Sequence, residues 1–258
     1  MNSDGPPRRA RTASSGRHGA FLDLGVGAML LLVVSGAIAW SFGLPPTYLL
    51  RVVALFGLAS ALLLRHLPPQ PPGTGLGPAN QVTLGRAMLV LPLAALVPHP
   101  EVQFSGGHWF IIGLATLALC LDGVDGWVAR RTNSVTAFGA RFDMELDSFL
   151  MLILAALVWR SGRVGPWVLL LGLPRYLFVI AGWRLAWLRA PLPERFRRKA
   201  GCVAQGIALL VCLGPIVPIP LAIAAAGAAL ALLLASFALD VVWLFRQRHT
   251  GVSAGVGL

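Results

Sequence analysis

Residues 121–148 read LDGVDGWVARRTNSVTAFGARFDMELDS and join two apolar stretches of the chain. The segment holds four aspartates, Asp122, Asp125, Asp143 and Asp147, in a chain with only 12% charged residues. Residues three or four apart share one face of a helix, so each pair of aspartates points in one direction. The short loop between the pairs lets the two helix ends lie side by side. The four carboxylates are therefore expected to converge.

The composition around this segment is that of a membrane protein. Of 258 residues, 57% are hydrophobic, and the mean hydropathy is +0.76, which is too apolar for a soluble domain. Apolar stretches of about 18 to 24 residues recur, each long enough for a helix to cross a bilayer core of about 30 Å. We predict an all-α polytopic membrane protein with about eight transmembrane helices. The predicted spans are 20–42, 47–65, 81–98, 108–129, 144–160, 165–183, 201–217 and 219–245.

A Pro- and Gly-rich linker, LPPQPPGTGLGPA at 67–79, cannot be helical and is the main predicted boundary. It separates an N-terminal transmembrane hairpin, 20–66, from a core at 80–246. Residues 1–19 are rich in Arg, Ser and Gly without an apolar period and are predicted to be a disordered basic tail. Residues 247–258 form a C-terminal tail.

The distribution of basic residues predicts the orientation in the membrane. The net charge of +11 clusters beside the apolar spans, which favours anionic lipid as its partner and argues against nucleic acid. Basic residues in short loops stay in the cytoplasm, so both termini and the aspartates are expected on that side. The rule has three exceptions, which are predicted to lie on the outer side: Arg51, Arg160 and Arg163. Compact loops and the Arg-rich composition favour a bacterial inner membrane.

Four carboxylates at a membrane edge cost several kcal/mol each unless a cation lies among them. Arg130, Arg131 and Arg141 are local counter-charges, and an all-oxygen site suits Mg²⁺ or Mn²⁺, with two ions matching four carboxylates in charge. Gly126 and Gly139 leave the backbone bare for a ligand. Arg130 lies about one turn beyond Gly126 and can reach a phosphate. Together these features indicate phosphoryl transfer.

The segment also matches a known signature. DGVDGWVAR, eight residues, and GARFDMELD have the form Asp-x2-Asp-Gly-x2-Ala-Arg-x8-Gly-x3-Asp-x3-Asp, which resembles the CDP-alcohol phosphotransferases of phospholipid synthesis at every fixed position. NQVTLGR at 80–86 is similar to the start of the family's first core helix, and RRKAGCVAQG at 197–206 to its basic entry to the fifth. The resemblance implies a six-helix core at 80–246, with the hairpin as an addition.

The resemblance also implies a mechanism. Asp122, Asp125 and Asp143 would hold two divalent ions against the pyrophosphate of a CDP-linked lipid such as CDP-diacylglycerol. Asp147 would lie near the second ion and act as the general base, so that the alcohol attacks the lipid-side phosphate and CMP leaves. A homodimer is implied as well. The residues expected to bind the nucleotide or CDP-lipid are Asn80, Thr83, Arg86, Gly126, Ala129, Arg130, Thr136 and Gly139.

The acceptor alcohol is less well defined by the sequence. Arg141, Arg175, Arg198 and Lys199 could form a basic pocket for a phosphorylated acceptor such as glycerol 3-phosphate or an inositol phosphate. Most of these residues are explained more simply as cytoplasmic anchors. Arg175 differs because it is expected mid-span, where an Arg requires a polar cavity or a carboxylate.

Two other functions also use acidic clusters in membranes. An Mg²⁺-dependent intramembrane prenyltransferase needs two separated clusters on different repeats, whereas this chain has one cluster. An acidic-site cation or proton transporter needs polar residues that continue toward the outer face, whereas the acids here lie at one edge of the spans. Both remain alternatives at the level of sequence.

Overall fold

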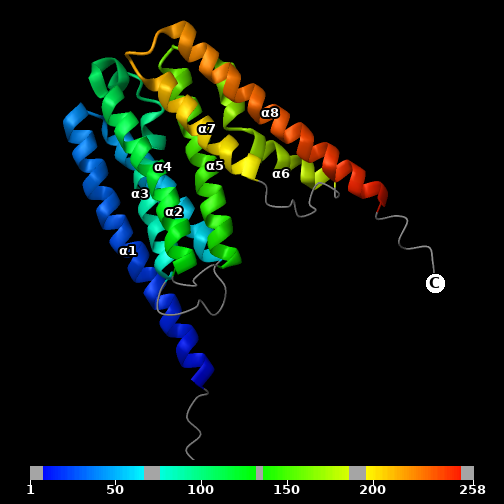
Figure 1. The fold of residues 1–258 in the computed structure, drawn as a ribbon. Helices are drawn as coiled ribbons and strands as arrows, with labels where there is room; N and C mark the ends of the chain where they lie inside the picture. Colours follow the sequence, from blue (N-terminus) through cyan, green and yellow to red (C-terminus); the bar gives the residue numbers. More distant parts are fainter. Residues whose placement is uncertain (1–7, 67–75, 132–135, 186–195, 251–258) are drawn as a thin grey trace, which may run out of the picture. The chain divides into compact units, whose positions relative to one another are not determined.

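All the secondary structure in the described part of the chain is helical (Figure 1). The structure is a computed structural model that describes the backbone of residues 8–66, 76–131, 136–185 and 196–250. Side chains are described for residues 19–66, 76–77, 80–124, 131, 136, 138–185 and 200–245. The predicted linker therefore lies mostly outside the described residues.

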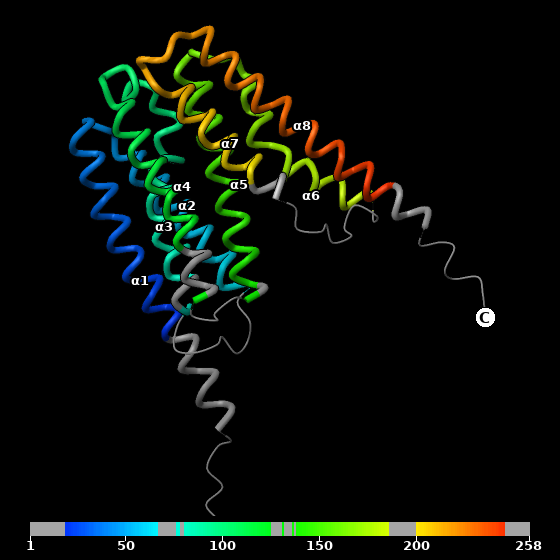
Figure 2. Tube along the Cα trace, viewed as in Figure 1, coloured from blue at the N-terminus to red at the C-terminus, as the bar shows by residue number. Residues whose placement is uncertain are grey.

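The chain divides into two compact units, Met1–Asp147 and Ser148–Leu258. The helices of the first unit are α1 (Arg8–Phe42), α2 (Pro46–His66), α3 (Pro78–Leu96), η1 (Gln103–Gly107), α4 (His108–Arg131) and the beginning of α5 (Ala137–Arg160). The second unit holds the rest of α5, η2 (Pro166–Leu171), α6 (Pro174–Arg184), α7 (Phe196–Leu213) and α8 (Ile219–Thr250). The path of the chain through these helices can be followed in Figure 2.

Local sequence explains where several of these helices begin and end. Pro residues occupy the first turn of α3, η2 and α6, where the missing N–H of proline costs nothing. Gly43 follows α1 with a φ of 61°, and the N–H of Leu44 reaches back 2.9 Å to the carbonyl of Ala39. This left-handed glycine ends α1 and turns the chain into α2.

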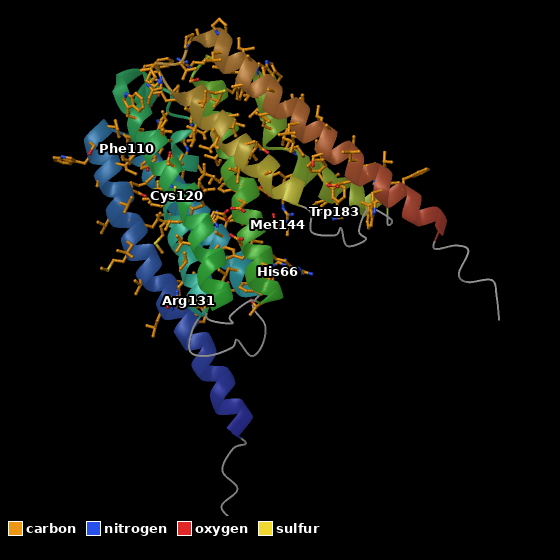
Figure 3. All side chains as sticks on the ribbon, viewed as in Figure 1. His66, Phe110, Cys120, Arg131, Met144 and Trp183 are labelled. Atoms are coloured by element: carbon orange, nitrogen blue, oxygen red, sulfur yellow. The ribbon has the colours of Figure 1, made fainter. Side chains whose placement is uncertain are left out.

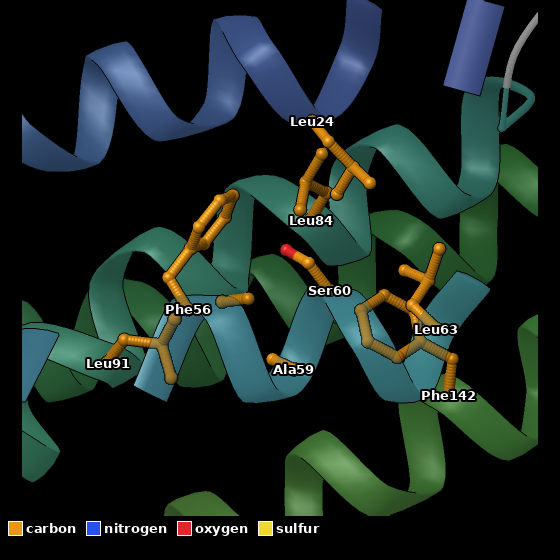
Figure 4. A pocket seen from close by; sticks show the side chains of 9 residues that line it. Leu24, Phe56, Ala59, Ser60, Leu63, Leu84, Leu91 and Phe142 are labelled. Atoms are coloured by element: carbon orange, nitrogen blue, oxygen red, sulfur yellow. The ribbon is translucent and has the colours of Figure 1, made fainter. Parts of the chain in front are cut away.

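Apolar packing holds the first unit together. Helices α1 and α2 pack against each other and against α3, and α3 packs against α4 (Figure 1). A buried cluster joins α1, α2, α3 and the residue that precedes α3; its members are Ala20, Leu24, Leu63, Leu76 and Leu84. Phe56, Leu84 and Phe142 line a small apolar cavity beside this cluster, shown in Figure 4.

The hairpin helices pack on the first helix of the predicted core. The hairpin helices α1 and α2 bury apolar residues against α3 and belong to the same unit as the start of the core. Helix α1 also begins at Arg8, so its backbone extends into the part of the chain predicted to be a disordered tail. Arg and Ala in this stretch are strong helix formers, which lets the helix continue beyond the apolar span.

The predicted span 165–183 is not one α-helix. It contains the short 3₁₀ helix η2, a break at Gly172 and Leu173, and then α6. An ideal Cβ built at Gly172 would overlap the backbone of Leu152 on α5, so the chain approaches α5 closely where the helix breaks. The proline at 174 then starts a new helix.

Helix length and composition confirm an integral membrane protein. Within the described residues, four helices are long and apolar enough to cross a bilayer: Gly19–Phe42, Pro46–His66, Gln103–Val124 and Ile219–Phe245. Two shorter apolar helices are Asn80–Leu96 and Ala200–Leu213. Many large apolar side chains point outward, among them Trp40, which is 90% exposed. The side chains that project from the helices are shown in Figure 3, and a lipid environment accounts for this apolar exterior. The total of eight spans stays a prediction.

Candidate active site

The end of α4 and the start of α5 bring three of the four motif aspartates together. Asp122 lies on α4, and Asp143 and Asp147 lie one turn apart on α5. One carboxylate oxygen from each residue lies within 4.8 Å of the others. The three side chains are 35 to 43% exposed. They form an open, all-oxygen cluster within the first unit.

A buried guanidinium lies among these carboxylates. Arg86 on α3 is fully buried, and its Nη1 lies 3.0 Å from Oδ1 of Asp122 and 2.6 Å from Oδ1 of Asp143. Its Nη2 contacts Oδ1 of Asp147. The Nε–H donates to the backbone carbonyl of Ala118, 3.2 Å away. One arginine therefore links three acids from two other helices.

Small residues on α4 make room for this arginine. Ala115 and Ala118 are fully buried, and together with Asp122 they follow the spacing of one helix face. Small side chains let membrane helices approach closely, and α3 packs against α4. The guanidinium of Arg86 can then reach both a carbonyl and a carboxylate on α4.

The sequence predictions did not identify Arg86 as the counter-charge. They assigned that role to Arg130, Arg131 and Arg141, and placed Arg86 among the nucleotide-binding residues. Arg141 is exposed in the structure, and the side chain of Arg130 lies outside the described residues. A signal was present in the sequence, because an arginine within an apolar helix requires a carboxylate or a polar cavity. The rule that predicts a polar partner for Arg175 predicts one for Arg86 as well.

A second group of predicted site residues meets beside the aspartates. The N–H of Gly139 donates to Oγ1 of Thr136 at 2.9 Å, at the start of α5. Asn80 on α3 is buried, and its Oδ1 would lie only 2.5 Å from a Cβ built at Gly139. Thr83, one turn beyond Asn80, is also buried. The structure thus places Asn80, Thr136 and Gly139 in one locality.

Other predicted site residues are described only in part or belong to the second unit. The side chains of Asp125, Gly126, Ala129 and Arg130, in the last turns of α4, lie outside the described residues, as do those of Arg198 and Lys199 at the start of α7. Arg175 is the second residue of α6, just after the break at Gly172 and Leu173, and is half-buried. Its position midway through a membrane span stays a prediction.

The donor set fits a hard divalent cation. Mg²⁺ and Mn²⁺ prefer carboxylate oxygens, and three are within reach of one another. The charge on Arg86 offsets only one of the three carboxylates, so a net charge of −2 remains in the cluster. One divalent ion would neutralise it.

Both a family model and individual proteins match this chain. The family model for CDP-alcohol phosphatidyltransferases matches residues 76–242. Ethanolaminephosphotransferase 1 from Homo sapiens is 37% identical over 122 residues, which cover 40% of this chain and 31% of that protein. The mouse protein of the same name (Mus musculus) is 36% identical over 122 residues, with the same coverage of both chains.

A plant relative covers a shorter stretch. CDP-diacylglycerol--inositol 3-phosphatidyltransferase 1 from Arabidopsis thaliana is 42% identical over 66 residues, which cover 24% of this chain and 29% of that protein. The matches therefore span about a third of the length of these relatives. No solved structure matches the chain significantly. Because the family model covers the whole helical region from α3 into α8, including the aspartate cluster, the chain belongs to the CDP-alcohol phosphatidyltransferase family.

Proposed function

We propose that this protein is a membrane transferase of phospholipid biosynthesis that moves the substituted phosphate group of a CDP-linked donor to an alcohol and releases CMP. The observation that carries the proposal is the cluster of Asp122, Asp143 and Asp147 within the region that the family model matches. Family membership favours this reaction over the prenyltransferase and transporter alternatives. CDP-diacylglycerol is the donor that we propose first.

The aspartates would divide two tasks between them. Asp122, Asp125 and Asp143 would hold Mg²⁺ or Mn²⁺, which when bound neutralises the charge on the pyrophosphate of the donor. Asp147 would lie near the second ion and also act as the general base. Arg86 contacts Oδ1 of Asp147, so Oδ2 is the oxygen proposed to take the proton. The acceptor oxygen then bonds to phosphorus as the bond to the CMP oxygen breaks.

The remaining site residues would bind the two substrates. We propose that Asn80, Thr83, Thr136 and Gly139 line the nucleotide site, together with Gly126, Ala129 and Arg130 at the end of α4. The Arg86 guanidinium contacts three carboxylates and one carbonyl, so we propose that it orders the aspartates beside the nucleotide site. Arg141, Arg175, Arg198 and Lys199 remain candidates for the acceptor site.

The distribution of basic residues indicates the side of the membrane on which the reaction takes place. We propose that the aspartates and both termini face the cytoplasm, because the basic residues gather beside that end of the spans. A bacterial inner membrane and a homodimer are also proposed, the first from composition and the second from the family.

The reaction is tested by measuring CMP release from the purified protein with Mg²⁺ or Mn²⁺. The names of the relatives describe two different transferred groups, ethanolamine phosphate and phosphatidyl. Two donors are therefore compared: CDP-diacylglycerol with glycerol 3-phosphate, inositol phosphate, inositol, serine or choline, and CDP-ethanolamine with diacylglycerol. Acceptor-dependent release from either donor would identify the transferred group. No release, combined with no metal-dependent binding of either donor, would contradict the proposed function.

Asp147→Asn tests the assignment of the base. We expect this variant to keep its fold and most of its affinity for the donor, with kcat lowered by about 10²- to 10⁴-fold, the usual contribution of general base catalysis. Glu145→Gln is the matched control, because Glu145 is exposed, lies on the same helix and has no proposed role. Near-normal turnover of Asp147→Asn would remove Asp147 from the role of base.

Asp122→Asn tests the metal site without relying on turnover. Loss of one carboxylate ligand should weaken Mn²⁺ binding and remove the Mn²⁺ dependence of CMP binding. Electron paramagnetic resonance of Mn²⁺ titrated into the protein measures this directly. A titration equal to that of the wild type would show that Asp122 is not a ligand.

A further inference from the structure

Asp23 is a carboxylate within the apolar part of α1, and it contacts the start of α3. Its Oδ2 accepts a hydrogen bond from the backbone N–H of Leu76 at 2.9 Å, and its Oδ1 accepts one from Nε2 of Gln81 at 3.1 Å. Charged residues within apolar membrane helices are rare and usually serve a defined partner. The partners of Asp23 are Leu76, two residues before α3, and Gln81 in the first turn of α3.

Leu76 connects Asp23 to Asn80, a residue of the proposed nucleotide site. Its carbonyl accepts a hydrogen bond from Nδ2 of Asn80 at 2.8 Å, and its side chain is buried in the cluster that contains Ala20 and Leu24 of α1. Gly77 follows with a φ of 85°, a conformation that favours glycine, and it provides no side-chain cap for α3. The position of Leu76 is therefore held from α1 and in turn orients Asn80.

Asn80 faces α5 at the proposed nucleotide site. With its amide nitrogen bonded to Leu76, the Oδ1 of Asn80 points toward Gly139, close enough that a Cβ there would lie 2.5 Å away. Gly139 is bonded to Thr136 through its N–H. A continuous series of contacts thus runs from Asp23 through Leu76 and Asn80 to the first turn of α5.

Apolar contacts already attach the hairpin to the core. Ala20, Leu24 and Leu63 bury their side chains against Leu76 and Leu84 without help from a charge. The hydrogen bonds of Asp23 therefore serve to orient Leu76 and Gln81 more than to hold α1 against α3. A charge-assisted hydrogen bond fixes an angle as well as a distance. This separates the role of Asp23 from simple packing of α1.

We propose that Asp23 is a positioning residue, which holds Leu76 so that Asn80 is oriented toward Gly139 in the nucleotide-binding part of the site. The proposal rests on the proposed function for its kinetic consequence. It gives the N-terminal hairpin, which lies outside the region matched by the family model, a part in substrate binding.

The test compares Asp23→Ala with Asp23→Asn in the full-length protein. Asparagine can still accept from the N–H of Leu76, and Gln81 can turn its amide to accept from the new Nδ2. Asp23→Ala removes both hydrogen bonds of the carboxylate, and we expect it to raise the KM for the CDP-linked donor and the Kd for CMP by about tenfold. The kcat should change by less than about twofold, and Asp23→Asn should restore most of the loss.

Leu24→Ala is the control for packing. It removes buried apolar area beside Asp23 while leaving both hydrogen bonds of the carboxylate in place, so it should lower the melting temperature without changing KM. A KM increase in Leu24→Ala equal to that in Asp23→Ala would overturn the proposal, because docking of the hairpin alone would then explain both.

Hydrogen–deuterium exchange gives a readout that does not depend on activity. Asp23→Ala should increase exchange in peptides that cover 76–84 and also in those that cover 136–142, while Asp23→Asn should not. Unchanged exchange at 136–142 would overturn the positioning role, whatever the kinetics. A wild-type protein that releases no CMP would contradict the proposed function only, since the exchange experiment would still decide the role of Asp23.

Discussion

Arg86 illustrates how a single buried side chain organises this site. Three carboxylates from α4 and α5 approach one guanidinium that is itself fully buried. Carboxylates this close repel one another, so the arginine lets them converge before any divalent ion is bound. Because the net charge of the four groups is still negative, the same arrangement retains attraction for a cation.

Arg86→Ala should therefore destabilise the protein most when divalent ions are absent. Loss of the buried cation leaves three uncompensated carboxylates, and breaking a buried ion pair costs about 3 to 5 kcal/mol. Partial exposure of the aspartates places the expected loss near the lower end. Thermal unfolding in chelator and in Mn²⁺ measures it, and Mn²⁺ should recover much of the loss. Arg65→Ala, an exposed arginine of α2, is the control. Equal destabilisation with and without Mn²⁺ would contradict this account.

Gly139 is a residue of α5 that lies close to α3 in the site. An alanine there would place its Cβ 2.5 Å from Oδ1 of Asn80 and 3.1 Å from Oγ1 of Thr136. We expect Gly139→Ala to raise the KM for the donor, because Asn80 must leave its hydrogen bond with Leu76 to make room. The free energy of unfolding should change by less than about 1 kcal/mol. Alanine favours the helix by about that amount, which offsets the lost hydrogen bond of Asn80.

Gly113→Ala is the matched control for Gly139→Ala, because a Cβ at that helical position meets no atom within 4 Å. Steady-state kinetics and thermal unfolding measure the KM and the stability of both variants. A normal KM for Gly139→Ala would show that the close approach of Asn80 has no part in donor binding.

At the scale of elements, two arginines that contradict the positive-inside pattern have structural partners. Arg51 on α2 donates through Nη1 to Nε2 of His99 at 2.7 Å, and Nδ1 of His99 lies 2.7 Å from Oε1 of Glu101. Arg163, between α5 and η2, donates through Nε to the carbonyl of Cys212 at 2.9 Å and through Nη2 to that of Val217. These contacts join neighbouring elements, so neither residue need mark the cytoplasmic side.

Arg163 caps the end of α7, and its removal should weaken the second unit. The last carbonyls of a helix have no partner within it, and Arg163 bonds to one of them and to the turn before α8. We expect Arg163→Ala to cost about 1.5 to 3 kcal/mol, the usual contribution of hydrogen bonds to a charged group. Chemical denaturation in mild detergent measures it, with the exposed Arg160→Ala as the control, expected within about 0.5 kcal/mol of wild type. Identical unfolding curves for Arg163→Ala and wild type would contradict the capping role.

At the scale of the whole molecule, the described site residues and three of the four acceptor candidates fall in different units of the chain, whereas the fourth candidate, Arg141, lies in the same unit as the aspartates. The aspartate cluster, Arg86 and Asn80 all belong to Met1–Asp147, whereas Arg175, Arg198 and Lys199 belong to Ser148–Leu258. Helix α5 is the element that runs from one unit into the other, and its first turns carry Asp143 and Asp147. Donor chemistry and acceptor choice can therefore be examined with separate sets of variants.

Membrane topology is a prediction for the molecule as a whole. Eight spans require both termini on one side, whereas η2 and α6 form an interrupted segment that could fail to cross. We expect a reporter fused after Leu258 to be active only as a cytoplasmic protein, and one inserted near Pro100, after α3, only as an external one. A C-terminal reporter on the outer side would show an odd number of crossings and identify the interrupted segment as the exception.

The sequence by itself determined the class of the protein and the chemistry of its motif. Apolar stretches of membrane-spanning length depend only on composition, and they predicted an all-α membrane protein that the structure confirms. The spacing of Asp122, Asp143 and Asp147 is a local property of helices, so the sequence predicts their convergence from the short segment between the two pairs of aspartates. The predicted family is confirmed for the same reason, because its signature is contiguous.

Only the tertiary structure decided which distant residues complete the site. Arg86 and Asp147 are separated by 61 positions, and Asp23 and Leu76 by 53, so no periodicity relates them. The pairing depends on which helices pack together, and that is set by apolar faces and small residues along their whole length. The break between η2 and α6 has the same origin, since it accompanies the close approach of Gly172 to α5. Local sequence specifies helices and motif spacing, whereas long-range packing selects the partner of each buried charge.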